Sequence, residues 1–201
     1  MTTVTGTAPA SRFRAAWTAA HAPVTGVPRW ARTVAGLVPL TVLPASLWRI
    51  AVCTFHAPIA RGALSSVDGS SGLPGVPLGL YVIVLSVVSE LLAFTAVGLV
   101  ATWGERFPGW LPGLRGRPVP ALAAVVPASL GAVVLTLLWT WVAVCLSLGL
   151  QINGQPQGPD APLGFGDWQG VVAVACYAPL LLWGPVLGAL TVSYWKRRRQ
   201  S

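Results

Sequence analysis

Residues 79–103 have the sequence GLYVIVLSVVSELLAFTAVGLVATW, in which Glu90 is the single charged residue. A helix needs about 20 mainly apolar residues to cross roughly 30 Å of hydrocarbon. This segment is long enough, and it follows a stretch rich in turn-forming residues over positions 68–77. It therefore predicts a transmembrane helix with one acid near the middle of the bilayer.

Three further apolar runs lie on either side of it, at residues 34–55, 119–150 and 168–195. Each exceeds the length of a spanning β-strand, which takes about 10 residues and alternates with a period of two. Backbone polar groups in hydrocarbon must be satisfied within the segment, which a helix achieves. The pattern predicts an all-α integral membrane four-helix bundle, and Pro127 offers a place for the third helix to kink.

The composition excludes an ordinary soluble domain. Hydrophobic residues make up 54% of the 201 residues and charged residues only 9%, too few to cover a soluble surface. The formal net charge is +8, but the basic residues gather at the ends of the apolar runs. They indicate contacts with anionic lipid headgroups of the bilayer, and we do not expect nucleic acid as a partner.

The distribution of basic residues predicts the orientation. Only Arg61 lies in the first and third connections between spans, whereas the N-terminal segment, the second connection and the C-terminus are all basic. The basic residues of these three segments are Arg12, Arg14, Arg29, Arg32, Arg106, Arg115, Arg117, Lys196, Arg197, Arg198 and Arg199. Cytoplasmic segments of membrane proteins carry the excess of Lys and Arg, so both termini are predicted to be cytoplasmic.

The chain is therefore predicted to have three parts. Residues 1–30 form a flexible cytoplasmic arm, residues 31–195 the domain of four transmembrane helices, and residues 196–201 a basic cytoplasmic tail. The predicted location is the cell (cytoplasmic) membrane, which the chain crosses several times.

The second connection contains WGERFPGWLP at residues 103–112 and closes with GRPVP at residues 116–120. Together with the second span and the start of the third, it resembles a connection in uncharacterised small four-span membrane proteins of GC-rich bacteria. The resemblance covers only this part of the chain. It implies a bacterial cytoplasmic membrane and no particular activity.

Glu90 is the first candidate for function, because an intramembrane carboxyl must be protonated, paired or exposed to a wet cavity. It is the candidate catalytic acid. Arg49 lies in the outer part of the first span, and Glu90 is about 8 to 10 Å deeper when residues are counted at 1.5 Å each. A long arginine side chain can partly close that gap. The alternatives are that Glu90 pairs only to fix helix register and that Arg49 extends outward to water.

Further candidate binding residues lie at the outer end of the first span and within the last two spans. His56 lies where it can sense pH or help to hold a ligand with Arg49 and Asp68, or it simply marks a wetted helix end. Aromatic side chains of the third and fourth spans can line a cavity and stabilise a cation, or serve only as packing bulk. These aromatic residues are Trp139, Trp141, Tyr177 and Trp183.

Several motifs are missing from the sequence. It contains no phosphate-binding Gly-Lys loop, no HExxH, no GxSxG and no CxxC, so neither a metal nor a cofactor is expected. The leading hypothesis is a membrane-complex component or small-solute-handling protein with a polar Glu90/Arg49 site. One alternative is a membrane-embedded enzyme on a lipid or isoprenoid substrate, similar to terpene cyclases, with Glu90 as general acid. The other is a proton-coupled transporter, which four spans build only as a homo-oligomer of two chains, a dimer.

Overall fold

The computed structural model describes residues 24, 26–60, 75–104, 118–158 and 163–200. Over these ranges the chain is helical and contains no β-strand. Most of the predicted N-terminal arm and most of the WGERFPGWLP connection lie outside the described residues, as does Arg61.

Four helical segments are long and apolar enough to cross a membrane, as the sequence predicted. The first three are single helices, α2 (Arg29–Cys53), α4 (Leu78–Gly98) and α5 (Ala121–Ser147). The fourth consists of α6 (Trp168–Tyr177) and α7 (Leu180–Gln200). The all-α prediction is confirmed for the described residues.

The helix boundaries differ from the predicted ones by several residues. α2, α4 and α5 each begin directly after a proline, at Pro28, Pro77 and Pro120. Proline has no backbone N–H and cannot donate within a helix, so it suits the position before the first turn. α4 ends earlier than predicted because the chain reverses into the short 3₁₀ helix η1 (Thr102–Gly104). Gly98 permits this reversal, since a Cβ there would lie 2.6 Å from the ring of Trp103.

The fourth apolar segment is interrupted between Tyr177 and Leu180. Pro179 lacks the N–H that would bond to the carbonyl of Ala175. Beyond the break the N–H of Leu181 bonds to the carbonyl of Ala178 at 3.2 Å, which is the tighter pattern of a 3₁₀ turn. The other helical prolines behave differently, since α5 continues through Pro127 and α7 through Pro185.

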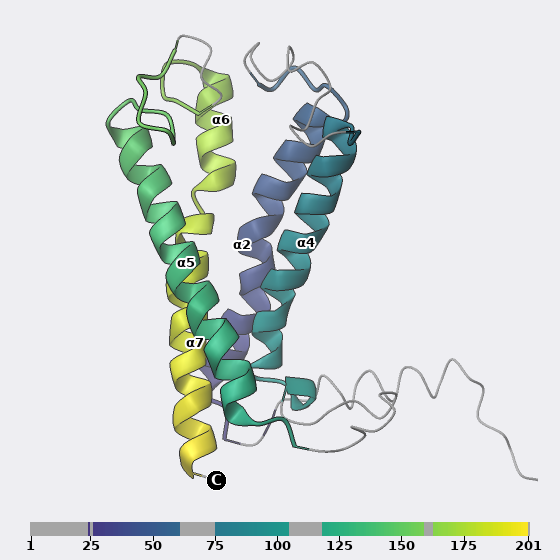
Figure 1. Ribbon diagram of the computed structural model, residues 1–201, viewed down its shortest axis with the longest axis vertical. Helices are drawn as coiled ribbons and strands as arrows, with labels where there is room; N and C mark the ends of the chain where they lie inside the picture. The colour runs from purple at the N-terminus through teal and green to yellow at the C-terminus, as the bar shows by residue number, and fades with distance from the viewer. Residues whose placement is uncertain (1–23, 25, 61–74, 105–117, 159–162, 201) are drawn as a thin grey trace, which may run out of the picture.

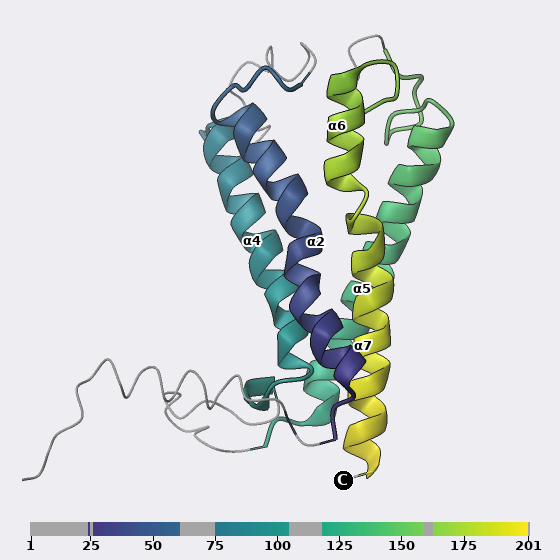
Figure 2. The same ribbon diagram turned by 180° about the vertical axis from the view of Figure 1, so that it is seen from behind.

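The helices form two antiparallel pairs, α2 with α4 and α5 with α7. α2 also packs against α6 and α7, whereas α4 and α5 are not closely packed. In cross-section the order is therefore α4, α2, α6/α7 and α5, an open arc. The two pairs meet near the C-terminus and diverge toward the opposite end (Figures 1 and 2). We call the half that contains the C-terminus the tail half and the other the loop half.

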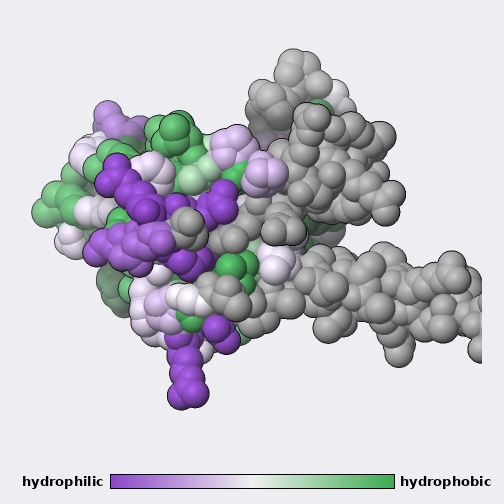
Figure 3. Space-filling model, turned by 90° about the horizontal axis from the view of Figure 1, so that it is seen from below, coloured by the Kyte–Doolittle hydropathy of each residue, from purple (hydrophilic) through white to green (hydrophobic). Residues whose placement is uncertain are grey.

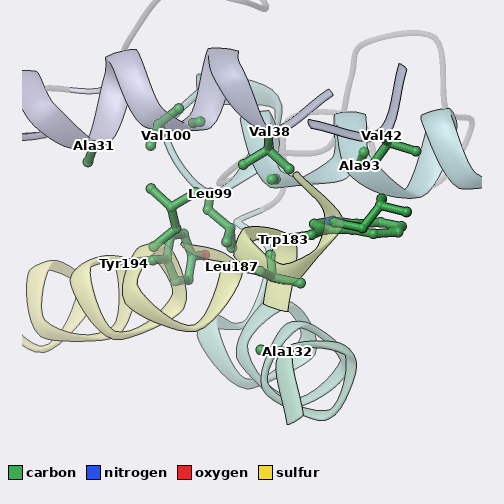
Figure 4. Packing of buried hydrophobic residues seen from close by; sticks show 14 of the residues in the cluster. Ala31, Val38, Val42, Ala93, Leu99, Val100, Ala132, Trp183, Leu187 and Tyr194 are labelled. Carbon is green, nitrogen blue, oxygen red and sulfur yellow. The ribbon is translucent and has the colours of Figure 1, made fainter. Parts of the chain in front are cut away.

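The main hydrophobic core lies in the tail half. It joins residues of all four segments, including Ala31, Ala35, Leu190 and Tyr194, each at most 1% exposed (Figure 4). α5 and α7 approach closely at Gly184, where an added Cβ would lie 2.9 Å from the backbone oxygen of Ala132. Small residues at helix contacts let backbones approach in this way, which strengthens packing inside a membrane.

Hydrophilic side chains gather at the tail end of the molecule (Figure 3). Helix α7 continues through the predicted basic tail to Gln200, so Arg197 and Arg198 are held on a helix. Arg197 Nη2 donates to the Leu99 carbonyl at 3.2 Å, and Arg198 Nη2 donates to the Val119 carbonyl at 2.7 Å. These arginines therefore connect α7 to the end of α4 and to the start of α5, in addition to any contact with lipid.

Candidate functional site

Arg49 and Glu90 face each other across the α2–α4 pair, close to α6. Ser46 lies between them: its hydroxyl is close to the Glu90 carboxyl, and its Oγ lies 3.5 Å from Arg49 Nη2, at the outer limit of a hydrogen bond. The helical spacing explains the cluster, because Ser46 and Arg49 are three residues apart and therefore share a face of α2.

Arg49 and Glu90 do not form an ion pair in the described part of the chain. Arg49 Nε and Glu90 Oε1 are both buried and without a hydrogen-bond partner. One turn from Glu90 on α4, the Ser86 hydroxyl is also buried and unpartnered, although the residue is only 2% exposed. We call Ser46, Arg49, Ser86 and Glu90 the polar site. It holds one basic and one acidic side chain and several unused hydrogen-bonding atoms.

The Arg49 charge reaches side chains on three helices. It acts on Glu90 of α4, on Cys53 of its own helix and on Tyr177 of α6. Tyr177 is the last residue of α6, so the break at Pro179 lies directly beside this charge. Broken helices beside a binding site are a feature of many membrane transporters.

Aromatic rings border the polar site. The ring centres of Trp48 and Tyr177 are 5.6 Å apart in an edge-to-face contact, and those of Trp139 and Tyr177 are 6.0 Å apart. The indole nitrogens of Trp48 and Trp139 are buried and have no hydrogen-bond partner. Each of these rings therefore presents both a π-face and an unused donor.

The predicted aromatic residues occupy different environments. Trp139 and Tyr177 belong to the border of the polar site, whereas Trp183 lies in the core of the tail half, 6% exposed. Trp141 is exposed and its indole N–H donates to the carbonyl of Ile152 at 3.2 Å, which fastens the loop after α5. Side chains two positions apart on a helix point about 200° away from each other, so Trp139 and Trp141 cannot share one cavity.

His56 lies in an exposed turn just after α2, with a positive φ of 52°. No interaction among the described residues connects it to Arg49. Asp68, which was predicted to hold a ligand together with His56 and Arg49, lies outside the described residues.

Sequence reasoning missed Ser46, Trp48 and Ser86. Their signal was present as spacing, since Ser46 precedes Arg49 by three residues and Ser86 precedes Glu90 by four. Serine is common in apolar helices, where its hydroxyl bonds to the backbone one turn earlier, so the spacing alone was weak. Ser89 shows that common case, because its hydroxyl donates to the Leu85 carbonyl at 2.7 Å.

No three His, Cys, Asp or Glu side chains among the described residues come together as a metal site would require. The polar site offers one carboxylate, which is not a ligand set for a metal. Its chemistry is recognition of charge, or proton donation from Glu90.

No family model matches the chain, and no curated protein or solved structure does so either. The geometry of the polar site therefore carries the functional argument by itself.

Proposed function

We propose that the protein is a multi-pass protein of the cytoplasmic membrane that handles a small solute, whose ionic groups it binds at the polar site. The observation that carries this proposal is that Arg49 and Glu90 lie within apolar helices yet do not pair with each other. A charged side chain inside a membrane costs several kcal/mol unless it is paired or hydrated.

A purely structural role fits this arrangement less well. Two opposite charges that served only to fix the helices would gain most from a direct ion pair with good geometry. Here the nearest shared contact is the Ser46 hydroxyl, and Arg49 Nε, Glu90 Oε1 and Ser86 Oγ remain unused. Unused donors and acceptors beside two separated charges are what an ionic solute requires.

The proposed orientation places the tail half in the cytoplasmic leaflet. Arg29 and Arg32 at the start of α2 lie at the same end as the basic residues of α7. The positive-inside rule then places both termini in the cytoplasm. In this orientation the polar site lies in the outer half of the bundle, where the helix pairs diverge.

A membrane-embedded enzyme acting on a lipid or isoprenoid is a second candidate. It is supported by the position of Glu90 close to the rings of Trp48 and Tyr177, which can stabilise a cation formed after protonation. An enzyme would need the Glu90 proton for each turnover, whereas a binding site needs only its charge.

A role as a membrane-complex component draws support from α5. Only 6% of its most apolar stretch is buried, against 33% for α2, so most of its surface is free to meet lipid or another helix. This role is compatible with the polar site and does not replace it.

The test uses Cys176 as a reporter of entry to the polar site. Cys176 lies one residue before Tyr177 and is partly buried, and Cys145 is buried in α5. In the full-length protein carrying Cys53→Ser, we would measure how fast Cys176 reacts with the anionic thiol reagent MTSES and with its cationic counterpart MTSET. The proposal predicts that both reach Cys176 and that Cys145 stays unmodified.

The charge of each residue should then appear in the ratio of the two rates. Arg49→Gln should shift the ratio toward the cationic reagent and Glu90→Gln toward the anionic one, because each substitution removes one local charge. Arg198→Gln, at the tail end, is the matched control and should leave the ratio unchanged. The proposal fails if neither reagent reaches Cys176 in the folded protein, or if the ratio ignores both substitutions.

A further inference from the structure

An apolar groove of about 540 Å³ runs through the tail half, in the opening between α4 and α5. This volume is within the range of about 300 to 1,000 Å³ that small-molecule sites have. Residues of α4, η1, α5 and α7 line it, among them Leu92, Thr95, Gly131, Leu135, Trp183 and Leu187. Its wall on α5 extends from Ala124 to Leu135, a length of about 16 Å at 1.5 Å per residue. The groove is therefore long and narrow.

Beyond the groove, the same face of α5 leads to Trp139, which borders the polar site. Leu135 lines the groove, and Trp139 lies one turn further along the same face. Trp139 contacts Tyr177 at 6.0 Å between ring centres, and Tyr177 lies within reach of the Arg49 charge. Trp139 and Tyr177 thus lie between the groove and Arg49 of the polar site.

Trp183 adds a hydrogen-bond donor to the wall of the groove. The residue is 6% exposed, and its indole Nε1 is buried without a hydrogen-bond partner. Figure 4 shows it extending from α7 toward Val42 and Ala93. A buried donor without an acceptor is rare in folded proteins, because a buried group that makes no hydrogen bond lowers the free energy of unfolding. An alkyl chain in the groove would not pair with this donor, so Trp183 contributes the face of its ring to the groove wall.

The two charges of the polar site restrict the head of such a ligand. A pure anion would satisfy Arg49 but repel Glu90, and a pure cation would do the reverse. A group that carries one anion and one cation satisfies both, with its anion at Arg49 and its cation toward Glu90 and the ring faces of Trp48 and Tyr177.

Resting on the function proposed above, we propose that the ligand is a zwitterionic long-chain amphiphile, with its head at the polar site and its hydrocarbon chain in the groove between α4 and α5. The bilayer supplies such molecules at high local concentration. The order of the features along the arc, two separated charges, then aromatic rings, then an apolar groove, follows the order of groups along the amphiphile.

The experiment measures binding of two probes to the purified full-length protein in a nonionic maltoside detergent, by native mass spectrometry. The probes are hexadecylphosphocholine, which has the long chain, and hexylphosphocholine, which has the same head and a short chain. The groove variant is Gly131→Leu, because an added Cβ there meets only Leu187, at 3.7 Å, and the longer side chain projects into the groove. The matched control is Gly36→Leu, where a Cβ meets nothing within 4 Å.

Gly131→Leu should weaken binding of the long-chain probe by about tenfold, because it fills the space for the chain, and leave the short-chain probe unaffected. Gly36→Leu should change neither. Trp183→Phe, which keeps the ring and removes the donor, should leave binding of both probes unchanged, because their alkyl chains carry no acceptor for the indole N–H. Glu90→Gln should weaken both probes.

The possible results separate the two proposals. If Glu90→Gln weakens both probes while Gly131→Leu and Gly36→Leu behave alike, the polar site binds its ligand without the groove and the amphiphile proposal is wrong. If Glu90→Gln leaves both probes unchanged, the polar site does not bind the head and the function proposed above is wrong as well. A circular dichroism spectrum of each variant shows whether it is folded before its binding is compared.

Discussion

The tail half and the loop half of the same four helical segments are held together in different ways. In the tail half, residues of all four segments form one large core that includes the fully buried Tyr194, and two arginines join α7 to its neighbours. In the loop half the buried apolar cluster contains only Trp48, Val52 and Ala173 at its centre. The polar site lies beside this smaller cluster.

This difference indicates how a small membrane protein accommodates an unfavourable site. Close packing of small residues against large ones in the tail half supplies the stability that the loop half lacks. The loop half is then free to contain two unpaired charges, a broken helix and unused indole donors. We expect substitutions in the tail half to reduce stability and substitutions in the polar site to alter binding.

The largest expected effect is that of Tyr194→Ala. Removing a fully buried aromatic side chain costs about 3–5 kcal/mol of unfolding free energy, because the cavity is not refilled. Trp48→Ala, which removes a comparable ring from the smaller cluster, should cost less. Reversible unfolding in mixed micelles measures both values. Equal losses would show that the two halves contribute equally to the free energy of unfolding, which would contradict the proposed difference between them.

A smaller loss is expected for Gly184→Val, which forces a side chain into the contact between α5 and α7. The Cβ would lie 2.9 Å from the backbone oxygen of Ala132, and overpacking of this kind costs about 1–3 kcal/mol. Gly36→Val is the matched control, since its Cβ meets nothing within 4 Å. A thermal unfolding midpoint that falls equally in both variants would contradict the close approach.

The spans were predictable because hydropathy alone decides whether a segment suits hydrocarbon. The break in the fourth segment was not. Pro44, Pro127, Pro179 and Pro185 all occur within apolar runs, yet the helix is interrupted only at Pro179 among them. A proline leaves one backbone carbonyl without its helical partner, and contacts with neighbouring helices decide whether the helix continues through it or is interrupted. The sequence of a single segment does not show those contacts.

The candidate site was partly predictable for a related reason. A charge in an apolar helix is conspicuous, so Arg49 and Glu90 could be named from the sequence. The groove depends on α4 and α5 remaining apart while α2 and α7 pack, which follows from contacts among all four segments. The same contacts place Trp139 at the polar site and Trp183 in the groove, a division that their spacing did not reveal.

A loss of about 1 kcal/mol is expected for Arg198→Gln, because it removes a charge-assisted bond of 2.7 Å to the Val119 carbonyl. Arg199→Gln is the control, because Arg199 lies over the exposed side of α7 and stacks on Trp195, with its guanidinium carbon 4.6 Å from the ring centre. Unfolding of the purified variants in the same micelles gives the difference. An equal effect of the two substitutions would mean that the bond to α5 adds nothing to the tail half.

The smallest expected effect, and the most direct test of the central claim, is the coupling between Arg49 and Glu90. A double-mutant cycle with Arg49→Gln, Glu90→Gln and the double variant gives their interaction free energy from unfolding in mixed micelles. Because the two side chains share Ser46 as a neighbour but form no direct ion pair, we predict a coupling of at most about 1 kcal/mol. If each single substitution instead cost about 3–5 kcal/mol and the double variant recovered most of that loss, Arg49 and Glu90 would be a structural ion pair and the polar site would not be a binding site.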